Sequence, residues 1–389
     1  MSFIPYGRQL IDEDDIQAVV DVLREPLITQ GPQIEMFEQS LCQYTGARFA
    51  IALSSGTAAL HLACRALGVK PGDVVWTSPI SFAASAACAI YCGAEIEFVD
   101  IDSDTHNISV EALSYRLQEA EKHGRTPKVV IVVHFAGRAC DMKEVRSLSI
   151  RYGFKIIEDA CHALGAVYMG ETIGGCQYSE ATVFSFHPVK CITTGEGGAV
   201  MTNNAEIAAQ CKSLRHHGIE YTPENFMTKN DREGYHEIQA VGYNYRLCGL
   251  NAALGVSQLK KLGAFIQARR AIAEEYFRGL SKLPLKLPLF DRVNENAWHL
   301  FVIEVFGDGV RDRVFASLRA LGIGVAVHYI PIYRHPAYQR PEVAYKKFPN
   351  AEKYYQSCLT LPINLAMTES DIDYVTSAVK LVLSQQSTS

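Results

Sequence analysis

The sequence predicts an α/β fold built on a large, mainly parallel β-sheet with helices on both faces. Between Phe49 and Asn203, short apolar runs alternate with helical patterns. Most runs are continuous in Val, Ile and Phe, which is typical of strands buried on both faces of a parallel sheet. The seven predicted strands are Phe49–Leu53, Val74–Thr77, Ile96–Val99, Val129–Val133, Lys155–Glu158, Ala181–Phe186 and Gly198–Thr202.

Helical segments connect these strands, as a parallel arrangement requires. The predicted crossover helices are Thr57–Leu67, Phe82–Tyr91, Val110–Lys122 and Met142–Tyr152. Together with the strands they form one large domain, which we place at residues 1–245. Within it, Tyr221–His236 is polar and rich in Asn, Lys, Asp and Gly. This stretch predicts a long loop that acts as a lid or contacts a partner.

A second, smaller α+β domain is predicted for residues 246–389, where the pattern changes. A long helix at Asn251–Leu283 is ended by Pro284 and Pro288. The remaining elements are predicted strands at Trp298–Phe306 and Ile323–His328, and predicted helices at Val310–Leu321, Ala351–Cys358 and Glu369–Ser384.

Composition and charge argue against several classes of function. The chain has 389 residues, of which 48% are hydrophobic and 20% charged, with a formal net charge of −5. We expect no nucleic-acid partner, no signal peptide and no membrane span, because a basic stripe, a charged leader and a long apolar stretch are lacking. The eleven cysteines form no Cys-x-x-Cys pair. They predict buried thiols in a cytoplasmic protein, and no metal site.

A lysine beside a proline follows one of the strands. The run Ala181–Phe186 leads into Pro188 and Lys190. Strand and helix interiors exclude Pro, so Lys190 is expected on a turn at the strand end. Apolar neighbours would lower the pKa of its amine, as attack on a carbonyl to form a Schiff base requires. Since most lysines are solvated, this stretch of sequence on its own favours a surface lysine over a catalytic one.

Other polar residues are expected at the same edge of the sheet, where open α/β sheets bind ligands. Gly56 and Thr57 follow the first strand and open a helix, so they form either an anion cup or a plain helix start capped by a hydroxyl. Asp159 follows Lys155–Glu158. Its carboxylate either pairs with a protonated ring nitrogen or caps the next segment.

Three further side chains belong to this group. His162 is on its own more often a structural residue than a catalytic one. Ser185 is either a further phosphate donor or a small polar residue in a strand, and Phe82 either stacks on a flat cofactor or packs in the core. In combination, an anion cup, an aromatic face, a carboxylate and a Schiff-base lysine describe a site for pyridoxal 5′-phosphate (PLP). A nicotinamide site is disfavoured, because no Gly-x-Gly-x-x-Gly follows a strand.

Motifs along nearly the whole chain resemble the PLP-dependent sugar aminotransferases of the DegT/DnrJ/EryC1/StrS family. The resemblance implies the aspartate aminotransferase-like fold (PLP fold type I), with a seven-stranded sheet and a smaller C-terminal domain. The motifs are Ile4–Arg8, Thr29–Pro32, Ser54–Ala59, Glu158–Ala160 with His162, Phe184–Lys190, Gly195–Gly198, Gly242–Arg246, and His328–Tyr329 with Pro331.

The resemblance implies a role for each site residue. Lys190 would carry the cofactor as a Schiff base, Asp159 would meet its ring nitrogen, and His162 would lie near its phenolic oxygen. Phe82 would stack on the ring. The residues implied to bind the phosphate are Gly56, Thr57 and Ser185, with Asn244 reaching across from the partner subunit of a homodimer with shared sites.

Within the family, the chain resembles the aminotransferases of pseudaminic acid synthesis. The pointers are Phe186–Lys190, Glu224–Phe226, Gly242–Arg246 and Gly255–Leu262. They imply transfer of an amino group from L-glutamate to C4 of a UDP-linked 4-keto-6-deoxy-N-acetylhexosamine. Contacts with the sugar nucleotide are expected from Tyr6, Arg8, Arg246, His328 and Tyr329.

Alternatives remain open at this point. Other members of the family aminate C3 or C4 of UDP- or dTDP-linked keto sugars and share most of these residues. A PLP enzyme that dehydrates or racemises its substrate is a second alternative. A binding protein that kept the fold without the activity is a third, although such a protein would need neither Lys190 nor Asp159.

Overall fold

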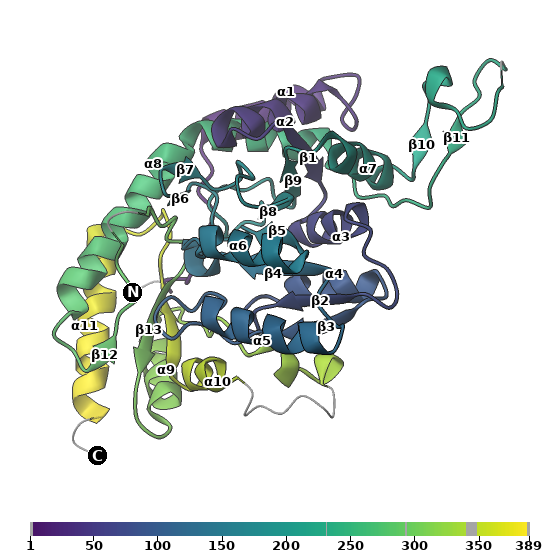
Figure 1. Cartoon of the computed structure of the whole chain (residues 1–389). Coiled ribbons are helices and arrows are strands. Elements are labelled where there is room, and N and C mark those ends of the chain that lie inside the picture. The colour runs from purple at the N-terminus through teal and green to yellow at the C-terminus, as the bar shows by residue number, and fades with distance from the viewer. Residues whose placement is uncertain (1–2, 231, 292–293, 340–347, 387–389) are drawn as a thin grey trace.

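A seven-stranded sheet forms the centre of the computed structural model, which describes residues 3–230, 232–291, 294–339 and 348–386 (Figure 1). Its strand order is β1-β9-β8-β5-β4-β2-β3. The strands are β1 (Phe49–Leu53), β2 (Val74–Thr77), β3 (Glu95–Phe98), β4 (Val129–Val133), β5 (Lys155–Asp159), β8 (Ala181–Ser185) and β9 (Gly198–Thr202). All seven predicted strands are therefore confirmed to within one residue at each end.

The sheet is mainly parallel, as predicted. β3, β2, β4, β5 and β8 pair in parallel, whereas β9 runs antiparallel to both of its neighbours, β8 and β1. The segment between Ser185 and Gly198 carries turns instead of a crossover helix, so β9 returns directly alongside β8.

Helices cover both faces of the sheet (Figure 1). In β4, Val130 and Val132 pack in a core with residues of the helices on one face, while Val129 and Ile131 pack in a core with those on the other. This burial on both faces explains why the strands read as continuous apolar runs. The first set is α2 (Pro32–Thr45), α5 (Val110–Lys122), α6 (Met142–Tyr152) and α8 (Gly249–Leu280); the second is α3 (Gly56–Ala66), α4 (Ala84–Tyr91) and α7 (Ala205–Arg215).

A second, three-stranded sheet follows the long helix α8. It is antiparallel and consists of β12 (Leu285–Lys286), β13 (Phe301–Val305) and β14 (Cys358–Leu361), and a third core packs it against neighbouring helices. These helices are α8, α9 (Val310–Ala320) and α11 (Glu369–Gln386), whereas α10 (Pro349–Ser357) contributes Ala351 and Tyr354 to the core that contains α3, α4 and α7. The arrangement agrees with the α+β pattern expected here, and the boundary between residues 245 and 246 stays a prediction.

One predicted element of this region is wrong. Residues 323–328 form no strand and make only isolated bridges, Ile323 with Ile4 and Ala326 with Thr360. Gly324 lies so close to the Ile4 carbonyl that a Cβ there would sit 2.6 Å from the oxygen. The segment is therefore held by the N-terminal chain at Ile323 and by a single bridge to Thr360 of β14 at Ala326. The third strand is β14, whose first residue had been predicted as the end of a helix.

Short elements complete the chain. Helix α1 (Glu13–Leu23) packs on α8. The predicted loop at 221–236 lies in a hairpin that projects from the body of the molecule (Figure 1), with strands β10 (Ile219–Glu220) and β11 (Glu237–Ile238). The others are the hairpin β6 (Val167–Tyr168) and β7 (Glu171–Thr172), and the 3-10 turns η1 (Phe135–Gly137), η2 (Pro223–Asn225), η3 (Ile332–Arg334) and η4 (Pro336–Tyr338).

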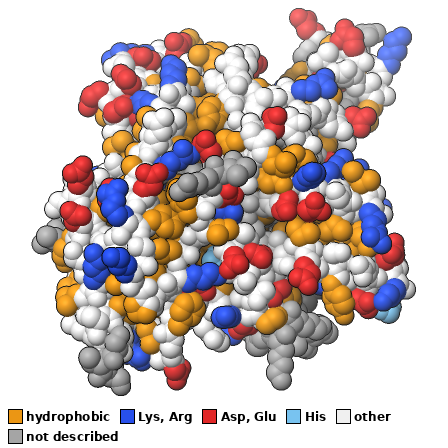
Figure 2. Space-filling model, turned by 60° about the vertical axis from the view of Figure 1, so that its left-hand side comes forward, with side chains coloured by type: hydrophobic (Ala, Val, Ile, Leu, Met, Phe, Trp, Pro, Cys, Tyr) orange, Lys and Arg blue, Asp and Glu red, His pale blue; other side chains and the backbone are white. Residues whose placement is uncertain are grey.

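All eleven cysteines are free thiols, and eight of them are buried. In the part of the chain that the structure describes, no helix is both long and apolar enough to cross a membrane. On the face shown in Figure 2, acidic and basic side chains are interspersed instead of forming a basic stripe.

Candidate active site

Strands β1 and β8 bring two of the candidate phosphate-binding residues together. Helix α3 begins at Gly56, and a Cβ at this position would lie 2.9 Å from the Cβ of Ser185 and 3.2 Å from the Sγ of Cys161. Only Gly allows this approach. The side chain of Ser55 accepts from the N–H of Ala58 and so caps α3. The free N–H groups of the first turn remain at a helix N-terminus that favours an anion.

Asp159 lies at the carboxyl end of β5 and is buried, with 6% of its surface exposed. Its Oδ2 accepts from the hydroxyl of Ser85 at 2.6 Å, and its Oδ1 accepts from the N–H of Cys161 at 3.2 Å. Both oxygens accept from neutral donors, and none of the described residues gives the carboxylate a cationic hydrogen-bond partner. A protonated ring nitrogen would supply the missing positive charge.

Lys190 lies on the predicted turn, where its N–H donates to the carbonyl of His187 at 2.9 Å. Its side chain is partly buried and makes no hydrogen bond or ion pair with any described residue. Burial lowers the pKa of the Lys190 amine, and the nearby Cys161 and Asp159 only partly offset this. The sequence-based prediction of a lysine with a lowered pKa therefore agrees with its surroundings.

His162 and Tyr329 come together from distant parts of the chain. The Nε2 of His162 lies 3.1 Å from the Oη of Tyr329, and the N–H of Ala136 donates to the Nδ1 of His162 at 3.3 Å. The ring of His299 lies against that of His162, with centroids 4.3 Å apart. Both nitrogens of His162 are thus engaged within the protein.

Phe82 is exposed over 62% of its surface, although it immediately precedes the buried helix α4. The alternative that Phe82 packs in the core is therefore not met, and its stacking on a cofactor stays a prediction. An apolar ring held in the open at the strand edge, one turn from the Ser85 that contacts Asp159, suits a ligand with a flat face.

The N-terminal segment reaches the same place. A Cβ at Gly7 would lie 3.3 Å from the Cβ of Val189, beside Lys190. Tyr6 packs its ring 5.1 Å from that of His328, and Arg8 lines a small cavity together with Lys190. The Nδ1 of His328 lies 2.8 Å from the Oγ1 of Thr360, and burial, followed by the charge of Lys190, lowers its pKa to about 4.

Arg246 and Asn244 lie at one side of this group. Arg246 pairs with Leu53 at the end of β1, and its guanidinium donates to the Nδ1 of His216 at 2.7 Å. Asn244 bridges to the backbone of His216, and its side chain is exposed. Its implied role at the phosphate site of a partner subunit stays a prediction.

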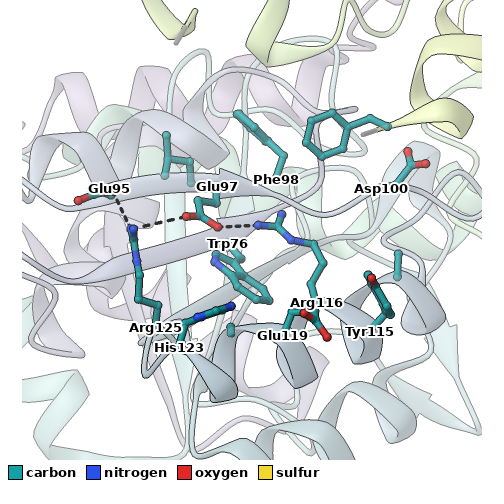
Figure 3. Close-up of a pocket in the computed structure, with 14 residues that line it drawn as sticks. Trp76, Glu95, Glu97, Phe98, Asp100, Tyr115, Arg116, Glu119, His123 and Arg125 are labelled. Carbon is teal, nitrogen blue, oxygen red and sulfur yellow. Dashed lines mark hydrogen bonds and ion pairs between the residues drawn. The ribbon is translucent and has the colours of Figure 1, made fainter. Parts of the chain in front are cut away.

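A large hollow of the described surface lies elsewhere. It has a volume of about 1100 Å³ and runs along the edge strand β3 and helix α5 (Figure 3). Its charges pair with each other: Arg116 with Glu97 at 2.5 Å, and Arg125 with Glu95 at 3.1 Å. None of the predicted site residues lines it, so we place the active site at the strand ends.

Comparison with known proteins identifies the family. The sequence profile of the DegT/DnrJ/EryC1/StrS aminotransferase family matches residues 9–380. The chain belongs to this family. As a DegT/DnrJ/EryC1/StrS aminotransferase it is an enzyme, which removes the alternative of a binding protein without activity.

Two curated relatives match this aminotransferase over nearly its whole length. The UDP-4-amino-4,6-dideoxy-N-acetyl-beta-L-altrosamine transaminase of Campylobacter jejuni (serotype O:2) is 38% identical, over 96% of this chain and 95% of the relative. The spore coat polysaccharide biosynthesis protein SpsC of Bacillus subtilis is 37% identical, over 97% of this chain and 96% of the relative.

Solved structures agree with the family. PseC of Helicobacter pylori, an aminotransferase involved in the biosynthesis of pseudoaminic acid, has a TM-score of 0.90 and 29% identity, covering 99% of this chain and all of PseC. Spr1654 of Streptococcus pneumoniae, solved in a PLP-form, has a TM-score of 0.88 and 27% identity, covering 98% and 99%. These similarities confirm the predicted PLP fold type I architecture.

Sequence reasoning missed several residues of the site. Ser85 and Cys161, which contact Asp159, and His299, which packs on His162, were not singled out. Tyr329 was expected as a contact of the sugar nucleotide, but its hydroxyl lies on His162. A signal for Ser85 exists, because it stands four residues after Ser81, a spacing that brings two hydroxyl groups together in a helical turn.

Proposed function

We propose that this aminotransferase binds PLP at the Lys190–Asp159 site and transfers an amino group from L-glutamate to C4 of a UDP-linked 4-keto-6-deoxy-N-acetylhexosamine. One observation carries the cofactor assignment. A lysine with a lowered pKa and no partner among the described residues lies at the same strand edge as a buried carboxylate that lacks a cationic hydrogen-bond partner. The name of the Campylobacter jejuni relative supports the choice of sugar.

The residues present fit the parts of PLP. Gly56, Thr57 and Ser185 would hold its phosphate, because the approach at Gly56 leaves room where a side chain would intrude. Phe82 would cover a face of the ring, and Asp159 would meet the ring nitrogen. PLP-form structures such as that of Spr1654 support this fit.

The side chains of this chain do the proton work. When bound, PLP would supply an aldehyde that condenses with amines and a ring that accepts electrons. The Lys190 amine, whose pKa is lowered by burial, would take the proton from the α-carbon of the donor; a positioned general base of this kind contributes about 10²–10⁴-fold. Asp159 would keep the ring nitrogen protonated by holding a negative charge beside it.

We also propose a homodimer with shared sites. The exposed side chain of Asn244 would reach the phosphate site of the partner subunit. The projecting hairpin exposes large apolar side chains, with Met227 at 78%, Ile238 at 66% and Tyr221 at 59%, and such a cluster on an arm is typical of a surface that another protein covers. The hairpin is thus assigned to partner contact rather than to a lid of its own subunit.

The sugar nucleotide would meet residues around the entrance. Tyr6, Arg8 and His328 lie on the N-terminal and C-terminal segments beside Lys190, and Arg246 lies at the end of β1. Arginine side chains suit the diphosphate of a sugar nucleotide. His328 and Tyr329 would border the sugar itself.

A second substrate assignment is supported by SpsC, whose similarity equals that of the transaminase to within a percentage point and whose name refers to a spore coat polysaccharide. In this alternative the enzyme aminates C3 or C4 of another UDP- or dTDP-linked keto sugar.

Product identification tests the assignment. The purified enzyme is incubated with L-glutamate and, in turn, UDP- and dTDP-linked 3-keto and 4-keto sugars, and each product is identified by NMR. We expect a 4-amino product from the UDP-linked N-acetyl sugar at the highest kcat/KM. A preferred 3-keto or dTDP-linked acceptor would overturn the assignment in favour of the alternative. Loss of the visible absorption band on adding glutamate without acceptor tests the donor separately.

A further inference from the structure

A chain of buried hydroxyl groups leads to Asp159 from the segment that carries Phe82. The Oγ of Ser85 lies 2.6 Å from the Oδ2 of Asp159, and the Oγ of Ser81 lies 2.6 Å from the Oγ of Ser85. Ser85 is completely buried, and Ser81 is 4% exposed. Asp159 and Ser85 are 74 positions apart, so the contact is made by the tertiary fold and belongs to no local turn.

The direction of each hydrogen bond in this chain is fixed. Two oxygens 2.6 Å apart require a proton between them. Ser85 donates to the Oδ2 of Asp159, so the proton between these two oxygens belongs to the Ser85 hydroxyl. Ser85 has then used its only proton, and the one between the two serines must come from Ser81. The chain therefore runs Ser81 to Ser85 to Asp159, each hydroxyl donating towards the carboxylate.

This arrangement ties two parts of the proposed cofactor site together. Ser81 and Ser85 flank Phe82, the exposed ring, and Ser85 also lies 3.3 Å from the carbonyl of Phe82. The same segment therefore sets the position of the ring face and the orientation of the carboxylate. The N–H of Cys161 holds the other oxygen, Oδ1, so Asp159 is fixed at both ends.

We propose that Ser85 is a positioning residue for Asp159, and that Ser81 fixes its hydrogen-bond direction. Ser85 touches neither substrate nor the reacting atoms; it acts by holding the carboxyl group of Asp159 so that it points at the ring nitrogen of PLP. This inference rests on the proposed function, because it needs a cofactor with a protonated ring at this site.

Removal of the hydroxyl has a defined expected effect. In Ser85→Ala, Asp159 loses a donor to its charged form, and hydrogen bonds to charged groups are typically worth about a 10- to 100-fold change in an equilibrium constant. We expect the dissociation constant of PLP, titrated into the apoprotein, to rise by about 10- to 100-fold. In Ser81→Ala the Ser85 donor remains, so a smaller rise is expected.

A double-mutant cycle separates positioning from general damage. Asp159→Asn replaces the charged acceptor with a neutral amide, so Ser85→Ala should add little to it, well below its effect in the wild type. Ser149→Ala serves as the matched control, since Ser149 is also a buried serine, with its hydroxyl on the carbonyl of Phe154, away from the site. Its PLP affinity should equal that of the wild type. Thermal unfolding of each apoprotein reports whether the fold is intact.

The outcomes distinguish this inference from the proposed function. If the wild type binds no PLP, the proposed function fails. If the wild type binds PLP but Ser85→Ala binds it equally well, or adds its full effect on top of Asp159→Asn, the role of Ser85 is refuted. Should Ser85→Ala not fold, Ser81→Ala decides instead: unchanged PLP affinity in that variant would overturn the proposed chain of donors.

Discussion

The Nε2 of His162 and the Oη of Tyr329 form a hydrogen bond of 3.1 Å whose direction is set by the backbone. The N–H of Ala136 donates to the Nδ1 of His162, so that nitrogen carries no proton and Nε2 does. His162 therefore donates to Tyr329. Burial, followed by the charge of Lys190, lowers the pKa of His162 and keeps it neutral. The proton of the Tyr329 hydroxyl is left free for another acceptor in the site.

Tyr329→Phe should accordingly affect both stability and catalysis. It leaves the Nε2–H of a buried histidine without an acceptor, at a cost of about 1–3 kcal/mol in the free energy of unfolding. It also removes the free hydroxyl proton, so kcat should fall. Urea unfolding and steady-state kinetics measure the two effects.

The matched control for this change is Tyr276→Phe. Tyr276 is a fully buried tyrosine whose hydroxyl donates to the carbonyl of Pro362 at 2.7 Å. Removal of this hydroxyl should lower the free energy of unfolding by about as much as Tyr329→Phe does, and should leave kcat unchanged. An equal kcat in the Tyr329 and Tyr276 variants would show that the Tyr329 hydroxyl has only a structural role.

Lys190→Ala should fold normally and lose turnover. The Lys190 amine has no partner among the described residues, so its removal breaks no hydrogen bond or ion pair of the folded chain. Borohydride reduction of the wild-type protein with bound cofactor, followed by peptide mass spectrometry, should find the adduct on Lys190 and on no other residue. Lys190→Arg keeps a positive charge without a neutral amine and should be equally inactive. Substantial transamination by either variant would contradict the role assigned to Lys190.

Asp159→Asn should fold and lose activity by orders of magnitude. The amide keeps the size of the carboxylate but not the charge that favours a protonated ring nitrogen. The size of the loss is measured as kcat/KM, with cofactor saturation checked by absorbance, so that weaker binding is not mistaken for slower chemistry. Rates near those of the wild type would remove Asp159 from the mechanism.

The sequence predicted where the strands end more accurately than it predicted the side-chain contacts made at those ends. The runs at Val129–Val133 and Ala181–Phe186 were recognisable because burial on both faces requires uninterrupted apolar residues. Ile323–His328 is similarly apolar, but it makes only isolated bridges, to Ile4 and to Thr360, and no continuous strand pairing. The hydrophobic pattern of a segment predicts that the segment is buried, but not which other segment packs against it.

The hydrogen bonds of the site could not be predicted from the sequence, for a related reason. Ser85 stands in an Ala-rich helix start, where a serine is unremarkable, and its acceptor is 74 positions away. His162 and Tyr329 are 167 positions apart. The residue types predicted which functional groups lie at the edge of the sheet. They did not predict the hydrogen-bond partner of each side chain, because that partner depends on how the whole chain packs.

Stability should fall in mild acid, in part because of His61. This residue of α3 is 3% exposed, and burial together with the charge of Arg65 lowers its pKa to about 4. Since its folded pKa lies below that of the unfolded chain, the unfolded state binds more protons below about pH 6.5, and acid favours unfolding. Between pH 6.5 and pH 5 this one group should cost about 2 kcal/mol.

His61→Phe tests this linkage, because it keeps an aromatic ring against Tyr91, Tyr243 and Tyr245 but cannot take up a proton. The difference in unfolding free energy between pH 7 and pH 5, measured in urea at fixed protein and cofactor concentrations, should shrink by about 2 kcal/mol. The exposed His123 provides the control substitution, His123→Phe. An unchanged difference in His61→Phe would show that another group titrates in this range.

Mixing two inactive variants tests whether Asn244 serves the partner's site. Asn244→Asp places a negative charge where the phosphate is proposed to bind, so this variant should be inactive, as should Lys190→Ala. In a mixed dimer, one site would combine both defects, while the other would have Lys190 from one protomer and Asn244 from its partner. Random exchange of subunits makes about half of the dimers mixed, and so restores about a quarter of the wild-type sites. Activity should therefore recover to about a quarter of the wild type after the two proteins are dissociated and reassociated together. If Asn244 instead acted within its own subunit, every site in the mixture would carry one defect, and no activity would return.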